Sequence, residues 1–360
     1  MKKLLFFPVV LLLILITWSV SGCNGNKKLQ VLPTDSIDVY ARLKPNEDCI
    51  SSRHTYGKDS IVGNTVKYRL TTDSSNVSVN FDVTTLELHP RITANLLSFV
   101  HNEMLTQGFI NEGDSIVPFN VDEMTEKGLT QSDIAKKVLY SESGLYYKEL
   151  PNILKYGVGF ELYIEIYPVF LNEDYVTFKK YSYSYTGGAH GNYSSFLQTY
   201  NRKTGESVDL EDIIIPEKID DVREKVATHM AANYPICPSV ATVEEYLDSL
   251  NQWKGLTEDP ELITLKNYPL SAPGVHGAGL VFAYERYLLA PGSEGCPVVL
   301  IPFDEIRDCL KEPFCNYHAD VDEFERYKEP NANADSVKCY TKEQLDSVSA
   351  AWSPADDGNP

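Results

Sequence analysis

Apolar and polar-tipped side chains alternate strictly between residues 159 and 170, and this period of two restricts the fold more than any other feature. Aliphatic residues occupy one face and tyrosine or glutamate the other: Leu162, Ile164 and Ile166 against Tyr163, Glu165 and Tyr167. Such alternation is typical of a β-strand with one buried face. Pro168 near its end predicts an edge strand, because proline cannot donate a ladder hydrogen bond.

Strand-like and helix-like segments alternate along the rest of the chain, and a strand hairpin is predicted at 64–88. Further strands are predicted at 175–185, 192–201, 206–210, 279–289 and 296–302, and helices at 92–107, 130–149, 216–234, 242–253 and 303–310. This order predicts an α+β fold with mixed or antiparallel sheets that carry helices on one face. A break near 150–159 predicts two domains, a small α/β unit (51–158) and a mixed-sheet unit with helices (159–312), followed by an acidic extension (313–360).

Two of the predicted helices carry recognisable start signals. Pro216 suits the first helical position, where a backbone N–H has no partner in any case. Thr242 and Glu245 have the spacing of a capping box, and Gly255 is placed to end that helix. These local signals predict helix boundaries to within a few residues.

The N-terminus resembles the leader of a bacterial lipoprotein. Lys2 and Lys3 precede an apolar run over 4–18, which is shorter than the about 20 residues that a spanning helix needs. Val20, Ser21, Gly22 and Cys23 then resemble a lipobox, in which the cysteine thiol accepts the lipid. We expect a signal peptide at 1–22, lipidation at Cys23 and a flexible tether at 23–50. An ordinary signal peptide or an uncleaved anchor are the alternatives.

The charge balance limits the partners. The chain has 51 acidic and 32 basic residues, a formal net charge of −19. A field of that sign repels phosphate, so nucleic-acid binding is not expected, and it repels anionic lipid as well. A membrane link therefore needs a covalent or inserted anchor. With lipidation at Cys23, we expect the protein in the bacterial cell envelope, on the periplasmic or outer-surface side, with the outer membrane favoured.

The cysteine count fits that compartment. Apart from Cys23, six remain, and an even number in an oxidising compartment predicts disulfides with the pairing left open: Cys49, Cys237, Cys296, Cys309, Cys315 and Cys339. No C-x-x-C motif occurs, and no two histidines lie within five residues of each other. We therefore expect neither a metal site nor a cofactor.

One predicted strand and the loop after it carry the candidate binding residues. Tyrosines at every second position share one strand face, and a glycine-rich loop leads into the next strand: Tyr181, Tyr183, Tyr185, Thr186, Gly187, Gly188, His190 and Tyr193. Tyrosine joins apolar area to a polar tip, which suits the recognition of sugar or protein. The alternative is structural: the glycines turn a hairpin, and a helix or the C-terminal extension covers the tyrosines.

Catalytic signatures are weak. Ser293 lies in a sequence that only superficially resembles G-x-S-x-G, because a proline replaces the first glycine and a strand follows. Asp209, Glu211 and Asp212 fit a turn and a helix start better than a calcium site. We therefore expect no catalytic residue. The alternative is a cell-wall hydrolase, or an accessory to one, with His190 or His276 beside a carboxylate.

Two stretches resemble a known family. Residues 183–213 contain Tyr-Thr-Gly-Gly-Ala-His-Gly and Asn-x-x-Thr-Gly, and residues 279–302 contain Phe-Ala-Tyr-Glu-x-Tyr and Val-x-Ile-Pro. Both are similar to the extracytoplasmic domain shared by the anti-sigma factor RsiV and the peptidoglycan deacetylase PdaC. The resemblance implies that 159–312 adopts the RsiV-like fold, a mixed sheet with helices like a subdomain of heat-shock ATPases, and that 51–158 is the smaller α/β domain that precedes it.

The same resemblance implies a class of ligand. RsiV binds lysozyme outside the membrane, so a lysozyme-like protein or a cell-wall glycan is the implied partner. We do not expect a sigma-binding segment, since only Met1, Lys2 and Lys3 precede the apolar run, or a deacetylase domain after 312. We therefore expect a binding or sensor protein without catalysis, and a structural envelope lipoprotein is the remaining alternative.

Overall fold

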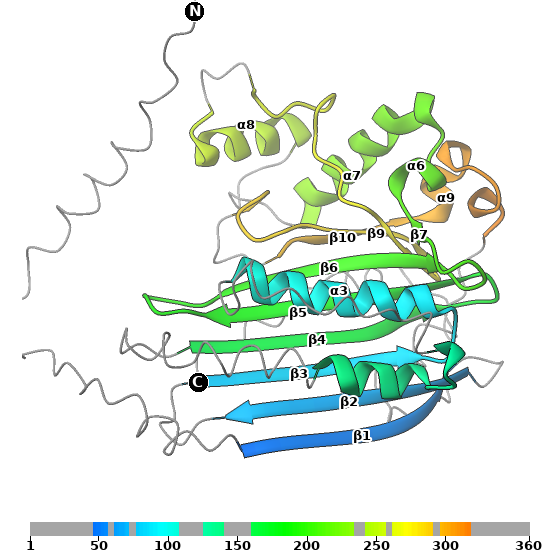
Figure 1. Cartoon of the computed structure of the whole chain (residues 1–360). Helices are drawn as coiled ribbons and strands as arrows, with labels where there is room; N and C mark the ends of the chain where they lie inside the picture. The colour runs from blue at the N-terminus through cyan, green and yellow to red at the C-terminus, as the bar shows by residue number, and fades with distance from the viewer. Residues whose placement is uncertain are drawn as a thin grey trace, which may run out of the picture. The chain divides into compact units, whose positions relative to one another are not determined.

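Two sheets and the helices packed on them form the folded part of the chain (Figure 1). The computed structural model describes residues 46–56, 61–71, 77–107, 125–139, 160–233, 242–256, 261–290 and 296–317. Side chains of 46–56, 69–71 and 77 are not part of that description. The predicted leader, the lipidation site Cys23, the tether up to residue 45 and the extension after residue 317 lie outside it. The tether predicted over 23–50 was too long, because residues 46–50 belong to the first strand of the large sheet.

The larger sheet has seven strands in chain order, β1 to β7, and the smaller has three in the order β10-β9-β8. The strands are β1 (Asn46–Tyr56), β2 (Ile61–Thr71), β3 (Val77–Leu86), β4 (Phe160–Leu171), β5 (Tyr175–Tyr185), β6 (Asn192–Asn201), β7 (Ser207–Val208), β8 (Gly274–His276), β9 (Gly279–Ala283) and β10 (Val298–Pro302). The labelled helices are α3 (Pro90–Thr106), α6 (Leu210–Ile213), η1 (Pro216–Lys218), α7 (Ile219–Asn233), α8 (Val243–Lys254), α9 (Phe303–Ile306), η3 (Arg307–Cys309) and η4 (Phe314–Asn316). Residues 131–139 are also helical. The fold is α+β, as predicted.

The connection between β3 and β4 decides how the two predicted domains meet. These two strands pair in parallel, with Val77 beside Phe160 and Val83 beside Ile166, whereas the other neighbouring strands are antiparallel. A parallel pair needs a long crossover, and α3 and helix 131–139 lie within it. The predicted units 51–158 and 159–312 therefore contribute strands to one hydrogen-bonded sheet.

Helix α3 covers one face of the large sheet (Figure 1). Its residues Leu96, Val100 and Met104 are fully buried and belong to one apolar cluster with Ile164 and Phe178 of the sheet. The His89 ring accepts a hydrogen bond from Arg91 N–H, and a proline occupies the first helical turn. The prediction of a helix over 92–107 is confirmed, because its apolar positions recur at the spacing that one sheet face can bury.

A second apolar core lies among α7, α8 and the small sheet. The start signals of these helices act as predicted: Pro216 opens η1 before α7, and Thr242 and Glu245 form a reciprocal capping box on α8. Gly255 ends α8 with φ 71°, a left-handed conformation that glycine adopts without a Cβ clash.

A pair of threonines joins the two sheets. Thr177 on β5 donates its hydroxyl to Val275 O at 2.6 Å, and Val275 N–H donates to the Thr199 hydroxyl at 2.9 Å. Gly274 permits this approach, since a Cβ there would lie 2.9 Å from Leu197 Cβ. The small sheet therefore covers the β5–β6 face that α3 leaves open, at the Thr177 end.

Three local predictions were wrong. Strand β4 is an interior strand, because β3 and β5 flank it, and Pro168 is tolerated at a register shift between Pro168 and Phe170. The strand predicted at 279–289 ends at Ala283, since Tyr287 has φ 67°, which no strand accommodates. The predicted strand at 206–210 has only two residues before α6 begins. No helix in the described ranges has the length and apolarity to cross a membrane.

Candidate functional site

The predicted tyrosine face of β5 points away from α3. Tyr181, Tyr183 and Tyr185 are half-buried on one side of the strand. The opposite side carries Ser182 and Ser184, whose hydroxyls donate to Glu103 of α3 and to Gln107 at its C-terminal end, at 2.6 and 2.7 Å. Helix α3 is therefore not the cover that the structural alternative required for these tyrosines.

The tyrosines continue across the neighbouring strands. Tyr183 is directly opposite Tyr163 on β4 and Tyr193 on β6. The Tyr163 and Tyr181 rings meet edge to face at 6.1 Å, and the Tyr181 and Tyr193 rings are 6.5 Å apart. Burial, and after it the Glu165 carboxylate, raises the pKa of Tyr163, so its hydroxyl stays protonated and can donate a hydrogen bond.

Charged residues border this tyrosine cluster on the β2–β4 side. Lys67 pairs with Asp82 at 2.6 Å. Burial, and then the charge of Asp82, raises the pKa of Glu165 on β4. Burial also lowers the pKa of Lys179, which faces the same side of β5. The tyrosine face is thus a mixed aromatic and charged surface and not an apolar core.

The glycine-rich loop is attached to the tyrosines beneath it. The Tyr185 hydroxyl donates to Gly188 O at 3.0 Å, and Gly187 and Gly188 have φ 95° and 112°. A Cβ on Gly191 would lie 2.5 Å from the Tyr183 ring, so only glycine allows this contact. His190 is exposed, and its Nδ1 lies 3.0 Å from Gly191 O. The loop therefore holds one shape while presenting its outer side to solvent.

An arginine that sequence analysis did not single out links this loop to the segment after β9. The Arg286 guanidinium lies 4.6 Å from the Tyr193 ring centroid and 5.1 Å from that of Tyr287, and it donates to Gly191 O at 3.1 Å. Tyr287 and Leu288 are the large apolar residues most exposed in the described chain, at 45% and 38%. We call residues 186–192 together with Arg286, Tyr287 and Leu288 the hairpin-tip surface.

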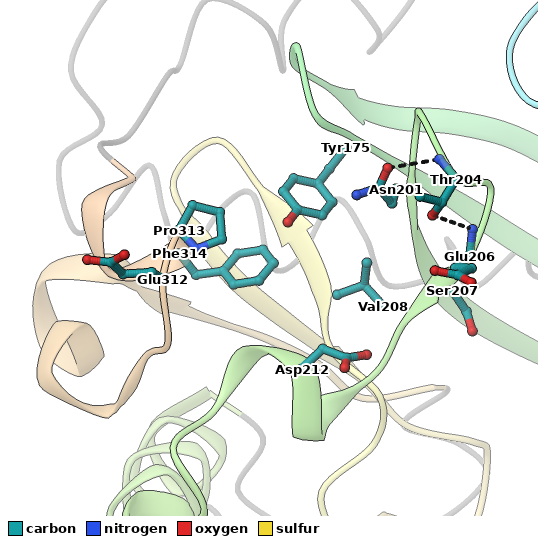
Figure 2. A pocket seen from close by; sticks show the side chains of 10 residues that line it. All are labelled: Tyr175, Asn201, Thr204, Glu206, Ser207, Val208, Asp212, Glu312, Pro313 and Phe314. Carbon is teal, nitrogen blue, oxygen red and sulfur yellow. Dashed lines mark hydrogen bonds between the residues drawn. The ribbon is translucent and has the colours of Figure 1, made fainter.

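A pocket of about 340 Å³ lies at the other end of β5 (Figure 2). Tyr175 and Phe314 form its aromatic wall, with ring centroids 5.0 Å apart. Glu206 and Asp212, on either side of β7, add carboxylates to its lining. Sequence analysis missed this site, because Phe314 was assigned to the extension and lies far from Tyr175 along the chain. We call it the Tyr175 pocket.

The two histidines of the hydrolase alternative differ in burial: His276 lies in the core and His190 at the surface. His276 is fully buried, accepts a hydrogen bond from Ala278 N–H at its Nδ1, and packs against the Phe170 ring. Burial lowers its pKa to about 3. His276 is therefore neutral near pH 7, too weak a base for proton transfer there. His190 is exposed, and its Nδ1 lies beside the Gly191 carbonyl oxygen.

The acidic residues near β7 and the cysteines have structural surroundings. Asp209 caps α6, and its N–H donates to Asp212 at 2.9 Å, as the predicted helix start requires. In the part of the chain that the structure describes, no three His, Cys, Asp or Glu side chains gather as metal ligands.

Cys296, Cys309 and Cys315 are free thiols here, and burial raises the pKa of Cys296 to about 11. Such a thiol is protonated and unreactive at neutral pH. Cys237, Cys339 and the Cys49 side chain lie outside the described residues. Disulfides that involve them stay a prediction.

No protein-family model matches the chain, and no curated protein matches it either. Its structure is similar to solved structures of the DUF3298 family. A member from Bacteroides fragilis shares 17% identity and a TM-score of 0.43, over 76% of this chain and 97% of that one. A DUF3298 protein from Pseudomonas aeruginosa shares 17% identity and a TM-score of 0.37, over 76% and 96%. The ligand of this chain has to be inferred from its own surface.

Proposed function

We propose that the chain is a lipid-anchored binding protein of the bacterial cell envelope that recognises a lysozyme-like protein or a cell-wall glycan and has no catalytic activity. The hairpin-tip surface carries this proposal. It combines an exposed tyrosine, an exposed leucine and an arginine on a backbone held by several contacts. Tyrosine and arginine are enriched among the residues that dominate the binding energy of protein interfaces. A tyrosine ring also offers apolar area to a sugar, and a guanidinium offers hydrogen-bond donors to its hydroxyls.

The backbone conformation of Tyr287 supports a role of the hairpin-tip surface in binding. A non-glycine residue at φ 67° costs on the order of 1 kcal/mol, and such strain persists where the surrounding structure and a function maintain it. Arg286 supplies that support, because it is stacked between Tyr193 and Tyr287 and bonded to Gly191. The surface is thus ordered before any ligand arrives, which lowers the entropy lost on binding.

The sequence signals at the N-terminus and the net charge complete the proposal. Lipidation at Cys23 would hold the protein at a membrane, and residues 23–45 would act as a tether. The charge of −19 attracts cationic proteins such as lysozymes over a distance of about 10 Å at 0.1 M salt. We therefore expect the affinity for a protein ligand to fall as salt rises.

Two probes test the binding proposal: a c-type lysozyme and soluble peptidoglycan fragments, each titrated against the full-length protein in detergent micelles. We expect saturable binding of at least one probe, and a Kd about 10- to 100-fold higher for Tyr287→Gly, which is the cost of removing an interface hot spot. Glu224→Gln, an exposed change on α7, is the control and should bind as the wild type does.

Binding of neither probe at low salt would overturn the ligand class, and equal binding by Tyr287→Gly would overturn the assignment of the surface. The anchor has a separate test. Palmitate labelling in cells should be lost in Cys23→Ala, and labelling that persists in this variant would overturn the lipid anchor.

A further inference from the structure

The Tyr175 pocket lies well away from the hairpin-tip surface. Tyr175 begins β5 and Tyr185 ends it, and an 11-residue strand spans about 33 Å between these ends. The pocket has about 340 Å³ of space, enough for a small molecule or one long side chain. A ligand bound there would not touch the loop over 186–192, so this pocket is a second place at which the chain can bind.

The charged side chains that line the pocket are all acidic. Glu206, Asp212 and Glu312 line it, whereas no Lys, Arg or His does among the described lining residues. Arg91 approaches Glu206 at 3.4 Å, but both side chains are more than half exposed, and such pairs contribute little. Burial raises the pKa of Tyr175, and the charges of Asp174 and Asp212 raise it further, whereas Lys203 opposes the shift.

The aromatic wall suits a cation as well. Tyr175 and Phe314 are only 9% and 2% exposed, and their ring planes are inclined by 37°. Figure 2 shows the two rings side by side in the pocket, beside Val208. The Tyr317 ring packs against both, at 6.2 and 5.6 Å, and keeps them in place. An ammonium group near such rings is attracted by their quadrupoles, and more strongly when it is partly desolvated.

One amide donor adds a second recognition element. Asn201 Oδ1 accepts hydrogen bonds from the N–H groups of Lys203 and Thr204, at 2.9 and 3.1 Å. This arrangement turns the Asn201 amide nitrogen away from the turn and toward Tyr175 (Figure 2). The pocket thus offers carboxylates and rings for a cation, and one donor for an oxygen atom on the same ligand.

We propose that the Tyr175 pocket binds an aliphatic ammonium group whose carrier also bears an oxygen acceptor. Two sources share this chemistry, an amino sugar and a lysine side chain in a peptide. In either case the carboxylates of Glu206 and Asp212 pair with the ammonium, the Tyr175 and Phe314 rings lie against the C–H groups next to it, and Asn201 donates to the oxygen. This inference goes beyond the proposed function and does not depend on it.

Calorimetric titration of the full-length protein in micelles tests the proposal with matched ligand pairs. Glucosamine is compared with N-acetylglucosamine, and Nα-acetyl-lysine amide with its Nε-acetylated form, because acetylation removes the positive charge and keeps the rest. We expect at least one amine to bind with a Kd in the millimolar range, and its acetylated form to bind at least tenfold more weakly. The amine that binds identifies the source.

Isosteric variants locate the site. In Asp212→Asn the amide oxygen still accepts from Asp209 N–H, so the α6 cap is kept while the charge is lost. We expect this variant, and Glu206→Gln, each to raise the Kd of the amine at least threefold, whereas Glu224→Gln on α7 leaves it unchanged. An unchanged melting temperature shows that the folds are intact.

Three results would overturn the proposal: no saturable binding of either amine up to about 50 mM, equal binding of an amine and its acetylated form, or an unchanged Kd in both pocket variants. Each of these is independent of whether lysozyme or peptidoglycan fragments bind at the hairpin tip, so the two proposals can fail separately.

Discussion

The two ends of β5 carry the same residue type in opposite settings. At the start of the strand, Tyr175 is 9% exposed and covered by Phe314. At the end, Tyr185 is half-buried under a loop whose outer side is open to solvent. One end therefore lines an acidic pocket and belongs to a core, and the other lies at the surface beneath the loop. The difference arises from what the rest of the chain brings to each end, and not from β5 itself.

The largest effect should appear when the aromatic wall of the pocket is removed. Phe314→Ala deletes a ring that is 2% exposed, and buried Phe→Ala changes lower the free energy of unfolding by about 3–5 kcal/mol. Tyr185→Ala at the other end should lower it by less than about 1.5 kcal/mol, since its ring is only half-buried. Urea unfolding followed by circular dichroism measures both. Equal losses in the two variants would show that the ends are alike.

A smaller change, an increase in the free energy of unfolding, is expected when Lys180 in the second half of β5 is replaced. Burial lowers the pKa of Lys180 from 10.5 to about 8, although the nearby Glu103 raises it. Because this pKa is lower in the folded than in the unfolded protein, the charged ammonium costs the folded state on the order of 1 kcal/mol at pH 7, and a methionine of similar length removes that cost. Lys180→Met should therefore be more stable than the wild type at pH 7, when measured by urea unfolding.

The same variant predicts a pH dependence with a definite sign. Between pH 8 and 10.5 the unfolded wild type binds more protons than the folded protein, so its free energy of unfolding rises with pH. The advantage of Lys180→Met should shrink over that window, and tyrosine ionisation should cancel in the comparison. Lys225→Met, an exposed change on α7, should show no such trend. A constant difference between Lys180→Met and wild type from pH 7 to 10 would contradict the prediction.

The smallest effect concerns the strained residue at the hairpin tip. Tyr287→Gly removes the penalty of a side chain at φ 67°, so the free energy of unfolding should rise, or fall by no more than about 0.5 kcal/mol, although a ring is lost. Thermal unfolding of this variant beside Tyr287→Ala isolates the backbone contribution, because alanine keeps the strain. If Tyr287→Gly were no more stable than Tyr287→Ala, the strain would have no energetic weight and one support for the binding surface would be lost.

Several elements follow from local patterns alone. The tyrosine face of β5, the apolar stripe of α3 and the capping box of Thr242 and Glu245 all depend on residues two to four positions apart. Such neighbours meet in any strand or helix, so the sequence predicts them without knowledge of the rest of the chain. The candidate binding residues between Tyr181 and His190 likewise lie close together, because they belong to one hairpin formed by β5, its loop and β6.

The features that sequence analysis missed depend on distant residues. Pro168 predicts an edge strand, yet β4 lies inside the sheet because β3 pairs with it across a long connection. The segment over 284–289 was expected to extend a strand, and instead Arg286 reaches back to Gly191 and Tyr193. No local period reports a contact between residues almost a hundred positions apart.

The sequence by itself determined the type of most strands and helices, the side of β5 on which the tyrosines lie, and the acidic charge that limits the partners. Only the tertiary structure decided which of those tyrosines are covered, that both halves of the chain share one sheet, and that Phe314 meets Tyr175 to close a pocket. The physical reason is that periodicity and capping act over a few residues, whereas burial depends on which distant segments pack together.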